Sequence, residues 1–430
     1  MSLNFIEELR WRGMLHDMIP GLEEHLQKEM TTAYIGFDPT APSLHIGNLA
    51  AIMLLKHLQL SGHKPIALVG GATGMIGDPS GKSAERDFLS EETLRENQIG
   101  IKAQLEKFLD FNCGENSAEV VNNYDWFKDF SFLGFLREAG KFLTVNYMMS
   151  KDSVQKRLET GLSFTEFSYQ LLQGYDFYHL YKTKNVRLQM GGSDQWGNIT
   201  TGTEIIRRKS EGENEERAFA LTTPLVTKSD GTKFGKSESG NVWLDASRTS
   251  PYDFYQFWLN AADADCPRLI RVFTLFSKEL IEQMEKEHAE APHLRILQKA
   301  IAEEVTSRVH GSKLTSLVME ASSLLFSKDA VDLLANASDE LLAQLPVLEL
   351  TTKDVGECNN LTDLLSVGTK NIIFSSKGDA RKAIQGNAVS LNKMKFTDPQ
   401  IDWKSIDKIR GQYLLVGNGK QKNYLLKFEA

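Results

Sequence analysis

The chain has 430 residues, enough for two to four domains, and its 41% hydrophobic and 25% charged residues are ordinary for a globular protein. No apolar stretch approaches the roughly 18 residues that a bilayer-spanning helix needs. The three cysteines are too far apart for a zinc site or a disulfide framework. We therefore expect a cytoplasmic protein with no membrane segment and with no zinc or other structural metal.

The net charge of −8 is unevenly distributed along the chain. Residues 361–430 contain 12 Lys and Arg against 6 Asp and Glu, whereas the first 360 residues contain 37 against 51. The end of the chain is therefore basic and the rest is acidic. This distribution suggests that the last 70 residues meet a polyanion.

The first elements predict a parallel sheet. Residues 33–37 form a short apolar run typical of a buried strand, a helix should follow over 44–60 with Ser43 as its N-cap, and a second buried strand should begin at Pro65. A strand, a helix and a strand within about 35 residues form a βαβ unit. The expected fold class is therefore α/β, with a Rossmann-like parallel sheet.

Later segments predict three further parts. A strand is expected at 186–190, helices dominate from Ser250 onward, and the end of the chain alternates between a helix and strands. The expected order is a catalytic domain at 1–247, an α-helical domain at 248–345, a linker at 346–360 and a small α+β domain at 361–430.

The first chemical motif is Pro-Ser-Leu-His-Ile-Gly-Asn at 42–48. His45 lies where the loop enters the helix, and both an imidazole donor and a helix N-terminus favour charge that builds on a phosphoryl group. Gly47 would let a nucleotide pack against the backbone. A single histidine in such a loop is more often structural.

The second motif is Lys-Phe-Gly-Lys-Ser at 233–237, where Lys233 and Lys236 flank a glycine. Alone, this segment is typical of a solvated turn. Taken together, the two motifs suit ATP that is attacked at its α-phosphate, because the leaving pyrophosphate needs donors on both sides. The glycine-rich segment 70–83 matches neither a P-loop nor a dinucleotide fingerprint, so neither a kinase nor a dehydrogenase is supported.

A polar stripe marks a third candidate region. Tyr169, Gln173 and Asp176 are spaced i, i+4 and i+7, which places them on one face of a helix. Beside apolar neighbours, this stripe predicts either a pocket wall or a solvent-facing surface.

The two motifs, in this order, resemble the signature sequences of class I aminoacyl-tRNA synthetases. Over essentially its full length the chain resembles bacterial-type tyrosyl-tRNA synthetases, through the segments at 34–40, 169–176 and 191–198 as well as the motifs. One departure is Asn48, because the first signature of that family often ends in histidine. Asparagine can donate a hydrogen bond but cannot carry charge.

The resemblance implies a role for each site residue. The implied catalytic residues are His45, Asn48, Lys233 and Lys236. Asp176 and Tyr34 would bind the substrate phenol, and the ammonium group would meet Tyr169, Gln173 and Asp78, with Gln195 close by. ATP would contact Gly36, Asp38, His45, Gly47, Gly192, Asp194 and Lys236, with Asp194 at the ribose hydroxyls.

The implied reaction joins L-tyrosine to its tRNA, with Mg-ATP as the co-substrate. The resemblance also implies a homodimer, for which the aromatic region Phe130–Met149 is a candidate interface. The last domain resembles a small RNA-binding fold of a ribosomal small-subunit protein, which maps RNA contacts onto Lys377, Arg381, Lys382 and Lys393. Two alternatives stay open: a tryptophanyl-tRNA synthetase, and a non-catalytic RNA-binding protein on a synthetase scaffold.

Overall fold

The computed structural model describes residues 4–78, 90–158, 161–210, 217–232, 234–237, 240–419 and 422–429. The chain divides into two compact units. The first comprises Met1–Thr249 and Leu259–Val309, and the second comprises Ser250–Trp258 and His310–Ala430.

A six-stranded sheet organises the first unit, with the strand order β1-β6-β5-β2-β3-β4. The strands are β1 (Asp17–Met18), β2 (Thr32–Phe37), β3 (Lys64–Val69), β4 (Glu119–Asn122), β5 (Val186–Gly192) and β6 (Phe219–Thr223). Neighbouring strands are parallel except at the β1 edge, which is antiparallel to β6. The carboxyl ends of β2 and β5 therefore lie side by side, at the edge where open parallel sheets bind ligands.

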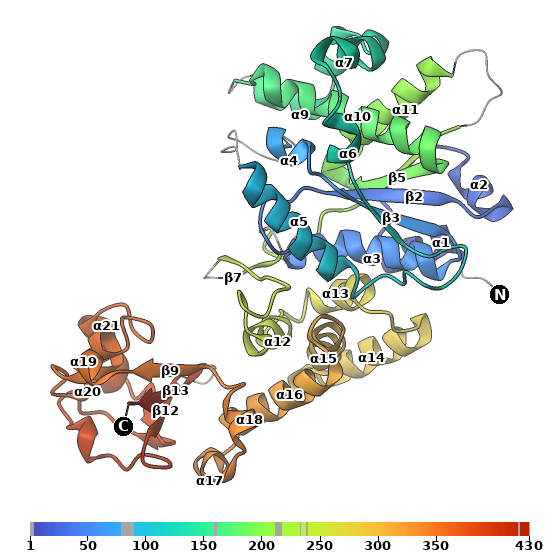
Figure 1. Ribbon diagram of the computed structural model, residues 1–430. Coiled ribbons are helices and arrows are strands. Elements are labelled where there is room, and N and C mark those ends of the chain that lie inside the picture. The colour runs from blue at the N-terminus through green and yellow to red at the C-terminus, as the bar shows by residue number, and fades with distance from the viewer. Residues whose placement is uncertain are drawn as a thin grey trace. The chain divides into compact units, whose positions relative to one another are not determined.

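Helices cover both faces of this sheet (Figure 1). The helix α3 (Ile46–Leu60) joins β2 to β3 and packs on one face with α1 (Phe5–Arg12), whereas α10 (Phe164–Lys184) and α11 (Trp196–Lys209) pack on the other. Apolar side chains of β2, β3 and α10 interlock in a buried cluster that includes Tyr34, Ile66 and Phe177. This packing confirms the predicted α/β class.

The remaining elements of the first unit surround these layers. They are α2 (Leu22–Lys28), α4 (Thr73–Ile76), α5 (Glu91–Leu105), α6 (Tyr124–Phe127), α7 (Phe132–Glu138), η1 (Gly140–Phe142), α8 (Val145–Met149), α9 (Asp152–Leu158), η2 (Ser193–Gln195), β7 (Lys236–Ser237), β8 (Gly240–Asn241), α13 (Cys266–Phe273), α14 (Lys278–Glu290), η3 (Pro292–Leu294) and α15 (Ile296–His310).

The second unit ends in a five-stranded sheet with the order β11-β10-β12-β13-β9. Its strands are β9 (Val347–Leu350), β10 (Val389–Leu391), β11 (Met394–Lys395), β12 (Tyr413–Asn418) and β13 (Lys422–Phe428). Its helices are α12 (Pro251–Leu259), α16 (Ser312–Phe326), α17 (Ala330–Asn336), α18 (Asp339–Leu342), α19 (Thr352–Val355), α20 (Leu361–Asp363), η4 (Leu364–Gly368), α21 (Lys377–Gln385) and η5 (Trp403–Ser405). Trp403, Ile384 and Leu414 are among the residues of its apolar core.

Three predictions differ from the structure. Residues 346–360, expected to be a linker, contain β9, which pairs in parallel with β13, and α19. The helix α3 begins after His45 and not after Ser43, whose hydroxyl donates to the Leu44 carbonyl at 2.7 Å. The helices expected as one domain at 248–345 are shared between the two units.

Within the described ranges, no helix is both long enough and apolar enough to cross a membrane. The same residues contain no group of three His, Cys, Asp or Glu side chains arranged to hold a metal ion.

Candidate active site

The first motif forms the entry to α3. His45 is the N-cap in an extended conformation, with φ −126° and ψ 172°. The side-chain oxygen of Asn48 accepts a hydrogen bond from the His45 backbone N–H at 3.1 Å. An N-cap bond of this kind satisfies a backbone donor that the helix leaves open. Asn48 therefore fixes the backbone that carries His45.

The second motif lies directly against the first. A Cβ atom added to Gly235, whose φ is +93°, would lie 3.0 Å from the backbone nitrogen of Gly47. Val242 donates its N–H to the Gly235 carbonyl at 3.0 Å and accepts from the Ile46 N–H at 2.9 Å. The two motifs are thus adjacent in space although almost 200 residues separate them. Lys233 lies outside the described residues, and for Lys236 only the backbone, in β7, is described.

The polar stripe on α10 ends in a buried carboxyl group. Asp176 is 2% exposed and accepts hydrogen bonds from Asn123 Nδ2 at 3.0 Å and from Trp126 Nε1 at 2.9 Å. Burial raises its pKa to about 8, against the opposing effect of these two N–H donors. The stripe is therefore an interior wall and not a solvent-facing surface.

Tyr34 on β2 completes this wall. Its hydroxyl is buried and has no hydrogen-bond partner among the residues that the structure describes. Burial, and secondarily the charge of Asp176, raise the pKa of Tyr34 well above its usual value. A buried hydroxyl without a partner costs roughly 1–3 kcal/mol, so this one calls for a polar group that the free protein does not supply.

Asp38 connects α10 with α4 through its two carboxylate oxygens. It accepts from the Tyr169 hydroxyl at 2.9 Å through one oxygen and from Thr73 Oγ1 at 2.8 Å through the other. Asn123 Nδ2 in turn lies 3.0 Å from Thr73 Oγ1, which links Asp38 to Asp176 through neutral side chains. Burial raises the pKa of Tyr169 well above its usual value, and Asp38 adds to this effect.

A second polar chain runs from α10 to α11. Gln195 donates to Asp78 Oδ2 at 2.7 Å and accepts from Gln173 Nε2 at 3.4 Å. Asn198 contacts the other Asp78 oxygen at 3.5 Å. Two acidic groups, Asp38 and Asp78, are thus held near Tyr169 and Gln173, where a cation would be attracted.

Two of the three glycines expected at the nucleotide lie at the carboxyl ends of strands, and the third, Gly47, is in the first turn of α3. Gly36 is the exposed position of β2, and Gly192 ends the neighbouring β5. A Cβ added to Gly192 would lie 2.7 Å from the Asp194 carboxylate in η2. Any side chain there would displace Asp194.

Sequence reasoning missed Thr73, Asn123 and Trp126, which bond the two central carboxylates. A signal was present, because Asn-Asn-Tyr-Asp-Trp at 122–126 places polar residues directly after strand β4.

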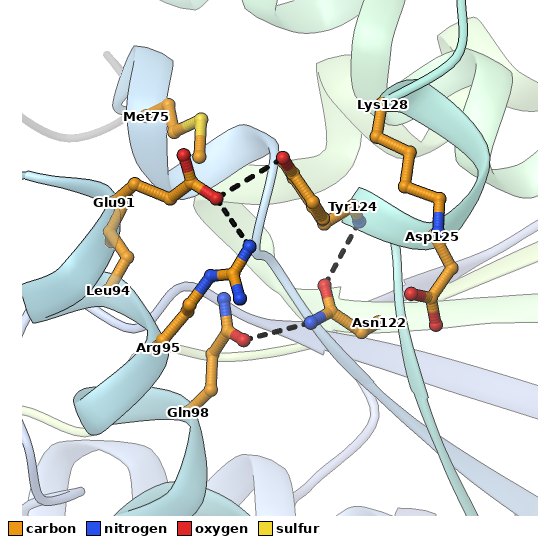
Figure 2. A pocket seen from close by; sticks show the side chains of 9 residues that line it. All are labelled: Met75, Glu91, Leu94, Arg95, Gln98, Asn122, Tyr124, Asp125 and Lys128. Carbon is orange, nitrogen blue, oxygen red and sulfur yellow. Dashed lines mark hydrogen bonds and ion pairs between the residues drawn. The ribbon is translucent and has the colours of Figure 1, made fainter.

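The same segment also lines a pocket of about 260 Å³ next to α4, shown in Figure 2. There the Glu91 carboxylate accepts from Arg95 at 2.5 Å and from the Tyr124 hydroxyl at 3.3 Å, and Asn122 donates to Gln98 at 2.9 Å. None of the predicted site residues lines this pocket.

The residues expected to contact RNA fall into two groups. Arg381 and Lys382 are exposed on α21. Lys377 pairs with Asp363 at 2.6 Å, and Lys393 donates to the Leu325 carbonyl at 2.7 Å. Lys393 is half-buried, and burial lowers its pKa.

Comparison with known proteins agrees with this geometry. Residues 26–327 match the family model of class I tRNA synthetases (W and Y), and residues 339–426 match the SYY-like C-terminal domain of tyrosine–tRNA ligases. The fold and the site therefore define a class I aminoacyl-tRNA synthetase.

Relatives narrow the class further. The chain is 61% identical over 429 residues to a tyrosine–tRNA ligase of Cytophaga hutchinsonii, and 58% identical over 428 residues to one of Amoebophilus asiaticus, in both cases with 99% of each chain covered. A C-terminally truncated mitochondrial tyrosyl-tRNA synthetase of Aspergillus nidulans is similar in structure, with a TM-score of 0.68, 29% identity, and coverage of 75% of this chain and 94% of that one. The chain belongs to the tyrosine–tRNA ligase family. Neither the tryptophan enzyme nor a non-catalytic scaffold is favoured.

Proposed function

We propose that this chain activates L-tyrosine at the carboxyl edge of its parallel sheet, and that Asp176 and Tyr34 together recognise the substrate phenol. The observation that carries the proposal is the pair itself: a buried carboxyl group beside a buried hydroxyl that has no partner among the described residues. A phenol can donate to Asp176 and accept from Tyr34 at once. Phenylalanine would leave the Tyr34 hydroxyl without a partner and would form no bond to Asp176, and two lost hydrogen bonds at roughly 1–3 kcal/mol each amount to a discrimination of several hundred-fold.

The ammonium group of tyrosine fits the polar chain beside this pair. Tyr169 and Gln173 present oxygen atoms, and Asp78 supplies negative charge close to Gln195. Asp38, expected at the nucleotide, is bonded to Tyr169 and Thr73, and we assign it also to holding Tyr169 in place. A cation recognised by charge and by directed acceptors is held in one orientation.

In the first chemical step, a carboxylate oxygen of tyrosine attacks the α-phosphorus of Mg-ATP. The bond to the bridging oxygen breaks, and pyrophosphate leaves with its electron pair. His45, Lys233 and Lys236 stabilise the negative charge on the phosphates, Asn48 holds the His45 backbone, and Gly36, Gly47, Gly192 and Asp194 accommodate the nucleotide. In the second step, a ribose hydroxyl of the terminal adenosine of tRNA attacks the activated carbonyl, and AMP leaves.

The basic end of the chain serves tRNA in this proposal, in the cytoplasm where tRNA and ATP occur. Arg381 and Lys382 are available for phosphate contacts, whereas Lys377 and Lys393 also have partners within the protein. The working division is therefore a catalytic part at 1–247, helices at 248–345 and an RNA-binding part that begins before β9.

A second copy of the chain is the proposed partner of α7. Phe132, Leu133 and nearby Val145 are each at least 65% exposed, and Leu136 is 39% exposed. Large apolar side chains gathered on one exposed helix are typical of a protein interface.

Tyrosine binding by the variants Asp176→Ala and Tyr34→Phe, measured by equilibrium dialysis, tests the phenol assignment. We expect Asp176→Ala to weaken tyrosine binding roughly 10- to 100-fold, because the buried hydroxyl of the substrate would lose its acceptor. Tyr34→Phe should weaken tyrosine binding about 10-fold, and it should also reduce the preference for tyrosine over phenylalanine. Asp125→Ala, which removes an exposed carboxylate from α6, is the matched control. Wild-type affinity in Asp176→Ala would refute the assignment.

A further inference from the structure

Residues 242–244 form a short extended segment along the His45 backbone. His45 and Trp243 are paired as an antiparallel bridge, flanked by the hydrogen bonds from Ile46 N–H to the Val242 carbonyl and from Leu244 N–H to the Leu44 carbonyl, both at 2.9 Å. Val242 and Leu244 are buried, at 4% and 1% exposed. Because side chains alternate along an extended segment, Trp243 points to the opposite side.

The indole of Trp243 meets the imidazole of His45 on that side. The two ring centroids are 5.9 Å apart and the rings are inclined by 65°, an edge-to-face arrangement. The guanidinium of Arg248 lies 5.2 Å from the indole centroid, and the backbone N–H of Trp243 donates to Thr249 Oγ1 at 3.0 Å. Trp243 is therefore held by its own surroundings, and it can restrict how the imidazole is oriented.

The same segment is bonded to the second motif. The Val242 N–H donates to the Gly235 carbonyl at 3.0 Å, one residue before Lys236, and Gly235 packs against Gly47. A shift of the backbone at Gly235 would therefore move residues that contact His45 directly.

We propose that Trp243 is a positioning residue for the activation of tyrosine: it orients the His45 imidazole and ties that orientation to the placement of the Lys-Phe-Gly-Lys-Ser segment. This inference rests on the role proposed above for His45. A donor aimed at charge that develops in the transition state must be held in place before the reaction. Losing its orientation lowers the rate of adenylate formation and leaves tyrosine affinity unchanged.

The test compares Trp243→Ala, Trp243→Phe, His45→Ala and the double variant His45→Ala/Trp243→Ala. Rapid quenching with labelled ATP gives the rate constant of tyrosyl-adenylate formation, and equilibrium dialysis gives tyrosine affinity. An edge-to-face pair contributes about 0.5–1.5 kcal/mol, so Trp243→Ala should lower the rate constant roughly 3- to 10-fold. Trp243→Phe should restore most of the rate, because it keeps an aromatic ring at this position. Trp11→Ala removes another indole packed beside arginine and serves as the control.

The double variant decides how Trp243 acts. If it acts through His45, the double variant is as slow as His45→Ala alone, because nothing remains to be oriented. If the two losses multiply, or if Trp243→Ala mainly weakens tyrosine binding, the proposal is overturned. A His45→Ala variant as fast as the wild type would overturn the role of His45 itself, and the positioning role with it, while leaving the Asp176 test unaffected.

Discussion

Asp176 shows how a single residue can combine recognition with a cost in stability. Its carboxyl group is fully buried, and two N–H donors only partly compensate for the loss of water. In the folded protein its pKa is about 8, compared with an ordinary value of 3.8. The folded state therefore holds a proton that the unfolded state releases between these two values. An apolar side chain would avoid this cost but could not accept a hydrogen bond from a phenol.

This shift predicts a pH-dependent difference between the wild type and Asp176→Ala. Below about pH 4 the carboxyl group is protonated in both states and costs nothing extra. As pH rises from 4 to 8 the wild type loses up to about 1.4 kcal/mol of unfolding free energy per pH unit from this group. Any cavity left by alanine costs the same at every pH. Urea unfolding without ligand should therefore show that the unfolding free energy of Asp176→Ala, taken relative to that of the wild type, is higher at pH 7 than at pH 5. A constant difference would mean that the pKa of Asp176 is not raised.

The residues of the site were easier to predict than their partners. The i, i+4, i+7 spacing correctly placed Tyr169, Gln173 and Asp176 on one helix face. It could not indicate that Tyr169 donates to Asp38, because that contact joins residues 131 positions apart. Spacing could not indicate the bonds from Asn123 and Trp126 to Asp176 either, because these donors lie about 50 residues from it in the sequence. Spacing reports which residues share an element, and tertiary packing decides what each one touches.

At the scale of elements, the local patterns predicted most of the strands and helices around the site. The apolar runs that became β2 and β3, and the periodic segment that became α3, carry their signal within a few residues. The prediction of a linker at 346–360 was wrong because β9 is only four residues long and is stabilised by pairing with β13, which lies over 70 residues later in the sequence. The predicted start of α3 was wrong because the N-cap is His45, a less common N-cap residue, and not Ser43.

The exposed face of α7 predicts how the chain associates. Leu133→Asp combined with Phe132→Asp should shift the proposed homodimer toward monomer, because each large apolar side chain contributes about 1.5–3 kcal/mol when buried. We expect the dimer dissociation constant to rise at least roughly 100-fold. Sedimentation equilibrium measures it directly. Ile99→Asp, at a position 72% exposed on α5, is the matched control. An unchanged dissociation constant would place the interface elsewhere.

At the scale of the whole molecule, activation and tRNA binding should be separable. A truncation near residue 357 would leave β9 without β13, so the cut belongs at Ala337, before α18. The shortened chain should form tyrosyl-adenylate normally yet charge tRNA at least roughly 100-fold less efficiently, because the basic segment is absent. In the full chain, Arg381→Gln with Lys382→Gln should reduce the salt dependence of tRNA binding by nearly two units of slope. Charging by the shortened chain at the full-length rate would show that the C-terminal segment does not serve tRNA.

The central claim is that the buried pair of Asp176 and Tyr34 makes this enzyme activate tyrosine. The most direct measurement is amino-acid-dependent exchange of labelled pyrophosphate into ATP, with the purified full chain and each of tyrosine, phenylalanine and tryptophan. We predict rapid exchange with tyrosine, and a kcat/KM at least several hundred-fold lower with phenylalanine, because phenylalanine lacks the hydroxyl that would bond to both Asp176 and Tyr34. Comparable exchange with tyrosine and phenylalanine, or faster exchange with tryptophan, would contradict the account.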